Sequence, residues 1–196
     1  LGISKDGRFG ALTNFRESSL GKNKFISRGW LIKSYLEQER LDAQTFFSQF
    51  NGDDFAGFSL LLGDNSGVHY LSNRSSRNEN LTKGTHVLAN RLLNSRSSKA
   101  GVVSNDFEQE RINFKSSSDY LKFLTDQSGG LNKLEDKLII KEEDELPYRF
   151  IKSDTYGTRC STILTIGPTG IYKVLEQRYG VKGKKEGAST FSFFPE

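Results

Sequence analysis

Cysteine, histidine and methionine are scarce in this chain of 196 residues, which has one Cys, two His and no Met. The single cysteine, Cys160, excludes an internal disulfide framework and a zinc site built from several thiolates. Two histidines, His69 and His86, are too few for a typical zinc constellation. This composition favours a reducing compartment, so we expect a cytoplasmic protein.

Long apolar runs are also missing, because no stretch approaches the roughly 20 residues that a membrane helix needs. We therefore predict no membrane span. Hydrophobic residues make up 35% and charged residues 27% of the chain, as in a globular protein with polar loops. The length allows one substantial core, so a single domain over residues 1–196 is expected. The start has no Met and no secretory signal pattern, which suggests that the first strands of the domain are missing.

Turn residues between short apolar runs predict three β-hairpins. In the first, Asp6–Gly7 supplies the tight turn, because Gly adopts positive φ without a Cβ clash. The predicted pairs are 1–3 with a strand from Phe9, 58–62 with 68–71, and 162–166 with 171–176. Further strands are expected at 85–89 and, as a sheet edge, at 189–194. We expect 58–62 and 162–166 to be buried on both faces.

Helical spacing of apolar residues predicts helices between these strands. They cover 30–39, a segment from Asp42 as N-cap to residue 50, a weak stretch near 107–114, and a helix over 120–124 capped by Ser118–Asp119. Residues 127–149 are interpreted as a loop with one short helix, and 180–187 as a mobile basic loop. Successive hairpins with helices between them indicate an α+β fold with two antiparallel sheets.

Polar side chains interrupt apolar stretches abruptly at Asn14, Asn90 and Arg159, and also at Ser27–Arg28–Gly29. An Asn amide N–H can stabilise an oxyanion, and an Arg guanidinium can bind a carboxylate or phosphate with two donors. The structural alternatives are a strand-end cap for each Asn and a surface ion pair for Arg159. The residues alone leave both interpretations open.

Five segments, taken together and in this order, resemble a known family. They are LGIS…GRFGALTNFRE, SRGWLIKSYL, FAGFSLLLGD, LTKGTHVLANRLL and YGTRCSTILTI. The chain is similar to the transport and Golgi organisation protein 2 family, also called the NRDE family after an Asn-Arg-Asp-Glu motif near its N-terminus. The resemblance covers residues 1 to about 176 and is weaker over residues 100–155.

The resemblance implies an N-terminal-nucleophile-hydrolase-like αββα sandwich, in which two antiparallel sheets lie between helical layers. In that fold an N-terminal Cys is the nucleophile and its own α-amine is the base. By resemblance Asn14 and Asn90 would line the pocket, and Arg159 would lie beside the N-terminal strand. The Met-Cys start and the NRDE segment are absent from this sequence, so a truncated domain without a candidate nucleophile is expected. Cys160 is expected to be an inert core residue of a strand.

The family is associated with Golgi organisation, secretion, and lipid and haem handling, which implies a role in intracellular trafficking. We expect a non-catalytic or cryptic member, located in the cytoplasm with Golgi or mitochondrial association. The implied partner is a hydrophobic or anionic small molecule such as haem, acyl-CoA or a lipid. Haem would be a transported ligand rather than a cofactor, because His69 and His86 are expected to be satisfied or surface residues.

The sequence allows two other functions. One is an N-terminal Cys amide or thioester hydrolase whose nucleophile strand is missing from this chain. The other is an anionic-ligand or nucleic-acid binder that uses the basic residues between 74 and 99. Ser and Asn, not aromatic residues, separate those charges, so no stacking platform for bases is predicted and nucleic acid is not an expected partner.

Overall fold

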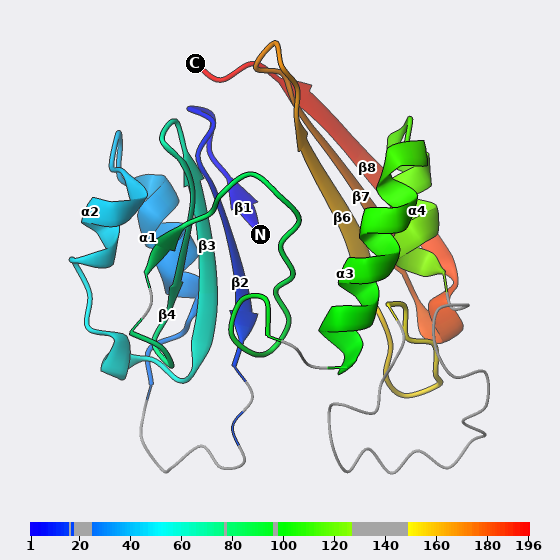
Figure 1. Cartoon of the computed structure of the whole chain (residues 1–196), viewed down its shortest axis with the longest axis horizontal. Helices are drawn as coiled ribbons and strands as arrows, with labels where there is room; N and C mark the ends of the chain where they lie inside the picture. The colour runs from blue at the N-terminus through cyan, green and yellow to red at the C-terminus, as the bar shows by residue number, and fades with distance from the viewer. Residues whose placement is uncertain (16, 18–24, 77, 96–97, 127–148) are drawn as a thin grey trace. The chain divides into compact units, whose positions relative to one another are not determined.

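The computed structural model describes residues 1–15, 17, 25–76, 78–95, 98–126 and 149–196 (Figure 1). The chain divides into two compact units, 1–95 together with Glu196, and 96–195. Each unit contains one antiparallel sheet and at least two helices. The predicted α+β class with two antiparallel sheets is therefore confirmed. The short helix expected between 127 and 148 lies outside the described residues.

The sheet of the first unit has its strands in chain order, each antiparallel to the next. They are β1 (Gly2–Ile3), β2 (Phe9–Asn14), β3 (Phe58–Asp64), β4 (Gly67–Ser72) and β5 (Glu79–Asn80). The first two predicted hairpins are confirmed. Gly7 in the β1–β2 turn has φ = 83°, a conformation that a residue with a Cβ adopts only at a cost.

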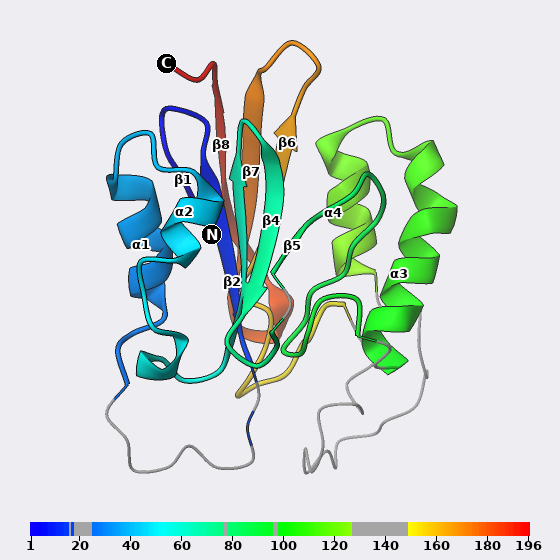
Figure 2. The same cartoon turned by 60° about the vertical axis from the view of Figure 1, so that its left-hand side comes forward.

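Helices α1 (Gly29–Glu37) and α2 (Ala43–Phe47) cover one face of this sheet, as Figures 1 and 2 show. The Asp42 carboxylate accepts a hydrogen bond from the Thr45 N–H at 2.8 Å, which confirms Asp42 as the N-cap of α2. The short 3-10 helix η1 (Gly52–Asp54) follows before β3.

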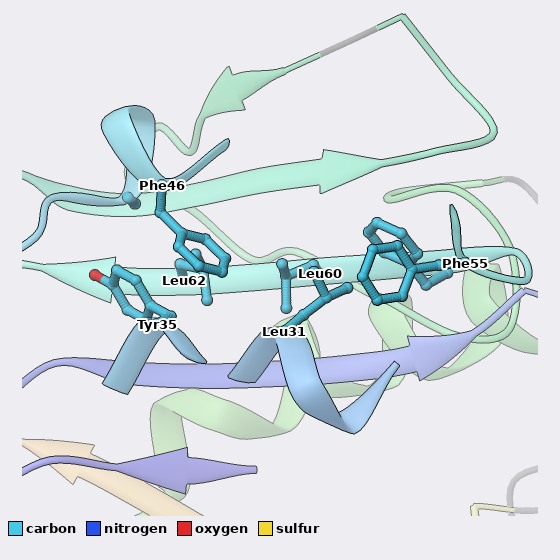
Figure 3. Packing of buried hydrophobic residues seen from close by; sticks show 8 residues of the cluster. Leu31, Tyr35, Phe46, Phe55, Leu60 and Leu62 are labelled. Atoms are coloured by element: carbon cyan, nitrogen blue, oxygen red, sulfur yellow. The ribbon is translucent and has the colours of Figure 1, made fainter. Parts of the chain in front are cut away.

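The core of the first unit lies between the helices and β3 (Figure 3). Its fully buried members include Leu31 and Tyr35 from α1, and Leu60 and Leu62 from β3. Both faces of β3 are largely buried, as predicted. Burying each of these side chains contributes about 1.5–3 kcal/mol, so β3 and α1 hold this unit together.

Residues 89–93 contact the opposite face of the sheet. Ser59 Oγ on β3 donates to Arg91 O at 3.0 Å, and the Leu93 N–H donates to the Tyr70 hydroxyl at 3.1 Å. These bonds join the loop after β5 to the polar side chains of β3 and β4.

The strand predicted at residues 85–89 is wrong, since this segment has no strand partner. The Val87 N–H donates to Asn94 Oδ1 at 3.0 Å, and Val87 O accepts from the Asn94 N–H at 2.8 Å. Ala89 O accepts from the Thr13 hydroxyl at 2.8 Å. Side chains and loop backbone therefore satisfy the groups that a sheet would otherwise have paired.

The second unit contains β6 (Cys160–Ile166), β7 (Tyr172–Tyr179) and β8 (Lys185–Phe193), in that order and antiparallel. The third predicted hairpin and the C-terminal edge strand are confirmed. The loop predicted over 180–187 is shorter than expected, because Lys185 and Gly187 already pair with β7 across a bulge. The 3-10 helix η4 (Val181–Gly183) occupies most of the remainder.

β6 is buried on one face only, at Ser161 and Ile163, which corrects the prediction of two buried faces.

The helices of the second unit are α3 (Ser98–Glu110) and α4 (Ser117–Thr125), joined by the 3-10 helix η2 (Arg111–Asn113). The predicted weak helix thus begins earlier, at residue 98. The cap of α4 is Ser116, two residues before the predicted one, because Asp119 Oδ2 accepts from both Ser116 N and Ser116 Oγ at 2.9 Å. The Arg149 guanidinium lies over the Phe123 ring, 4.0 Å from its centroid.

Candidate functional site

Asn14 and Asn90 lie together in the first unit. Asn90 Nδ2 donates a hydrogen bond of 2.9 Å to the carbonyl oxygen of Asn14, across a separation of 76 residues. Asn14 is the last residue of β2, and both asparagines are exposed. The structure therefore places the two predicted asparagines at one end of the first sheet.

The Asn90 amide has a structural role and also retains hydrogen-bonding capacity. Its hydrogen bond to Asn14 O is a cap at the end of a strand, which is the structural interpretation that the sequence left open. An Asn side chain has two N–H donors and a carbonyl acceptor, so one bond does not exhaust it. The Asn14 side chain has no hydrogen bond to any residue in the described ranges. The pair can therefore present N–H donors to an external oxygen atom.

The loop that carries Asn90 is held by bonds on both sides of it. Thr13 Oγ1 donates to Ala89 O at 2.8 Å, directly before Asn90. Asn94 Nδ2 contacts His86 Nδ1 at 3.0 Å, and His86 Nε2 contacts Thr82 O at 2.8 Å. These bonds involve side chains and backbone on several segments, so they position the loop around Asn90 without a regular element.

A charged cluster that includes Arg28 from the predicted Ser27–Arg28–Gly29 stretch follows the end of β2. Glu17 Oε1 accepts from Arg74 Nε at 2.6 Å, and Glu17 Oε2 accepts from the Gly57 N–H at 3.2 Å. Arg28 Nη1 donates to Gly57 O at 2.8 Å. The hydrogen bond from Arg74 is the largest cause that lowers the pKa of Glu17 below its ordinary value. A Cβ at Gly57 would lie 2.9 Å from Phe15 Cβ, so the close approach requires glycine.

Arg159 belongs to the second unit, where it lines a cavity of about 220 Å³ formed by residues 153–159 and 180–181. Its carbonyl oxygen accepts from the Tyr179 N–H at 2.8 Å. Its side chain is exposed, and no described residue forms an ion pair with it. The guanidinium is therefore available to an anion. That Arg159 shares a pocket with the two asparagines stays a prediction.

Cys160 is exposed, so the prediction of a core cysteine is wrong. It begins β6 and pairs with Arg178 of β7 at the end of the sheet, where the helices of this unit do not cover it. Hydrophobic neighbours in the sequence indicated the strand correctly but could not indicate which face of it is covered.

Each histidine forms at least one side-chain hydrogen bond with a described residue, as predicted. His69 is 4% exposed, and its Nε2 lies 2.8 Å from Ser66 Oγ and 3.5 Å from Asp64 Oδ1. His86 uses both ring nitrogens in the bonds given above. Within the described residues no group of three or more His, Cys, Asp or Glu side chains could hold a metal ion. The described helices also include none that is long and apolar enough to cross a membrane.

Comparison with known proteins identifies the family. No curated protein matches the chain significantly. The family model described as transport and Golgi organisation 2 matches residues 1–180, which include residues 1–95 of the first unit and most of the second unit. The match agrees with the resemblance of the ordered segments, and it includes Asn14, Asn90 and Arg159. The chain therefore belongs to the transport and Golgi organisation 2 family.

Proposed function

We propose that this protein acts in intracellular trafficking as a non-catalytic member of its family, by binding a hydrophobic or anionic small molecule such as haem, acyl-CoA or a lipid. The description of the family names transport and Golgi organisation. The observation that carries the proposal is the hydrogen bond from the Asn90 side-chain amide to the Asn14 backbone carbonyl, which brings these two exposed residues together at the end of β2.

The donors available suit oxygen-bearing anions. Amide N–H groups bind carboxylate or carbonyl oxygens as single donors, and a guanidinium binds a carboxylate or phosphate with two parallel hydrogen bonds. Arg159, exposed and without an ion-pair partner among the described residues, can supply the second kind. Haem propionates and the phosphates of acyl-CoA are ligands of this class.

Binding, rather than bond cleavage, is the proposal because the hydroxyl of the residue before Asn14 is already engaged. Thr13 precedes Asn14, and its hydroxyl proton is donated to Ala89 O at 2.8 Å. A nucleophilic hydroxyl requires a base to remove its proton. A backbone carbonyl cannot act as that base.

We also propose that the two sheets stack as the inner layers of an αββα sandwich, so that residues 1–196 form one domain. In each unit the helices pack on one face of the sheet, α1 on β2 and α4 on β6. In the second unit the uncovered face carries apolar side chains, of which Ile166 is 49% and Phe191 61% exposed. When one face of a sheet is covered and the other is apolar and uncovered, packing of the apolar face against a second layer is favourable.

Titration of the chain with haem tests the binding proposal. We expect a saturable change in the haem absorbance spectrum, and binding about tenfold weaker for Arg159→Ala, because a charge-assisted bond is worth about 1.5–3 kcal/mol. Arg111→Ala is the matched control, since Arg111 is exposed and already pairs with Glu108 at 2.7 Å. The same titration with palmitoyl-CoA tests the acyl-CoA alternative. If neither ligand saturates, the proposal is wrong.

A further inference from the structure

A cavity of about 330 Å³ lies in the first unit between α2 and the edge formed by β4 and β5. Its volume is within the range of small-molecule sites, about 300–1,000 Å³. Helix α2 packs on β4, so the cavity has a wall on each side. The lining includes Gln44, Phe47, His69, Asn78, Glu79 and Asn80. None of these belongs to the Asn14–Asn90 pair.

His69 is held rigidly at this cavity. Ser66 Oγ donates to Asp64 Oδ1 at 2.6 Å, so it must accept from His69 Nε2, which lies 2.8 Å away. Asp64 is fixed in turn by the Ala43 N–H at 2.9 Å. Burial acts to raise the pKa of Asp64, but hydrogen bonds from Ser66 and Ala43 outweigh it and lower the pKa. Asp64 is therefore a stable anion that favours the proton on Nε2.

The other nitrogen of the ring is consequently an acceptor. With the proton on Nε2, neutral His69 has a lone pair on Nδ1. No described residue forms a hydrogen bond with this nitrogen. A ligand in the cavity that presents an N–H can therefore complete the hydrogen bonding of a side chain that is only 4% exposed.

The remaining lining is rich in amide side chains and poor in positive charge. Gln44, Asn78 and Asn80 use no side-chain hydrogen bond within the described part of the chain. Each amide offers a donor beside an acceptor, the pattern with which Asn and Gln pair with the edge of a nucleobase. Phe47 provides an aromatic surface on which a planar ring can stack. The charged residue among the described lining residues is Glu79, whose carboxylate repels phosphates.

We propose that this cavity binds a neutral, planar nitrogen heterocycle of the nucleobase class. The ligand donates an N–H to His69 Nδ1, its donor–acceptor edge meets the amides, and its face lies against Phe47. The site differs from the proposed haem or acyl-CoA site both in position and in charge preference, so the two proposals fail independently.

Isothermal titration of the full chain with adenosine tests the proposal. We expect saturable binding, with affinity lowered about tenfold, or about 1.4 kcal/mol, by Gln44→Ala and by Asn78→Ala, since each variant leaves a polar edge of the ligand unmatched. Both side chains are exposed, so the variants should keep the fold of the parent chain. Gln38→Ala is the matched control, because Gln38 is an exposed amide at the end of α1 outside the cavity.

Titration with AMP separates this ligand class from anionic ligands. AMP should bind no more tightly than adenosine, because its phosphate finds no cation in the described lining. Tenfold tighter binding of AMP would overturn the proposed class of ligand. Absence of saturable adenosine binding, or affinities of the two cavity variants equal to that of Gln38→Ala, would overturn the site itself.

Discussion

Replacing Arg8 by Ala should remove about 3–5 kcal/mol from the stability of the first unit, because the buried guanidinium donates hydrogen bonds to several groups that would lose their partner. Arg8 is 7% exposed. Its Nη1 donates to Tyr35 O at 2.7 Å, its Nη2 to Leu36 O at 3.3 Å, and its Nε to Asp6 Oδ2 at 2.8 Å. The guanidinium also lies 5.1 Å from the centroid of the Tyr35 ring.

The magnitude follows from what each partner loses. Tyr35 and Leu36 are in the last turn of α1, where carbonyl oxygens have no partner within the helix. The last turn of α1 contains no basic residue, so the guanidinium of Arg8 from the β1–β2 hairpin supplies the favourable charge. A hydrogen bond to a charged group contributes about 1.5–3 kcal/mol. Two lost carbonyl bonds alone account for the expected range.

Hydrogen exchange of the β2 and β3 amides measures this loss, because it reports the stability of the first unit separately from the second. Arg8→Lys should be intermediate, since the ammonium keeps the charge but cannot reach all partners with a fixed fork. Arg111→Ala should change stability by less than about 0.5 kcal/mol, because its ion pair is exposed. A loss below about 1 kcal/mol for Arg8→Ala would refute the reasoning.

The effect of Arg8 should also depend on pH. Burial acts to raise the pKa of Asp6, but hydrogen bonds from Ser4 and Arg8 outweigh it, and the pKa lies below its ordinary value of 3.8. A carboxyl with a depressed folded-state pKa stabilises the fold above its ordinary pKa. This contribution disappears as the pH falls through the folded-state value. The difference between the parent chain and Arg8→Ala should therefore shrink in acid.

Two further predictions concern packing and the arrangement of the sheets. Gly63→Ala should destabilise the first unit by about 1–3 kcal/mol, because its Cβ would lie 1.9 Å from Phe9 Cε1. Gly101→Ala should instead stabilise the chain by about 0.5–1 kcal/mol, because Gly101 lies in a helix and its Cβ would meet nothing within 4 Å. Thermal unfolding that ranks the two variants in the opposite order would contradict this. A nitroxide label on Cys160, the single cysteine, should broaden the NMR signals of inner-face residues of the first sheet if the sheets stack as proposed. Unbroadened signals throughout that sheet would exclude the sandwich.

The sequence predicted those elements whose signals are local. Asp42 caps α2 because its carboxylate reaches the N–H three residues later, and Gly7 forms the first turn because of its own φ. The strand at 85–89 failed for a non-local reason. Its hydrophobic run is β-like, but bonds from Thr13 and Asn94 take the backbone groups that a neighbouring strand would need.

The candidate site could be predicted only in part, for the same reason. The polar strand ends drew attention to Asn14 and Asn90, but the bond between them joins residues 76 positions apart. The Glu17–Arg74 ion pair joins residues 57 positions apart, and neither segment has a local pattern that predicts this contact. Arg8 has the appearance of an ordinary turn residue, and its role depends on carbonyl groups 27 and 28 positions later.

The way in which Asn90 is held favours binding over catalysis at this site. Asn94 is held at φ = 54°, and the bonds of Asn94 and Thr13, each worth about 0.5–1.5 kcal/mol, position the loop. Catalytic groups must be held within about 0.5 Å by packed supporting side chains. A donor on an exposed loop held by polar bonds can instead adjust to ligands of different shape. This matches a protein that carries a hydrophobic anion by a few donors and releases it again.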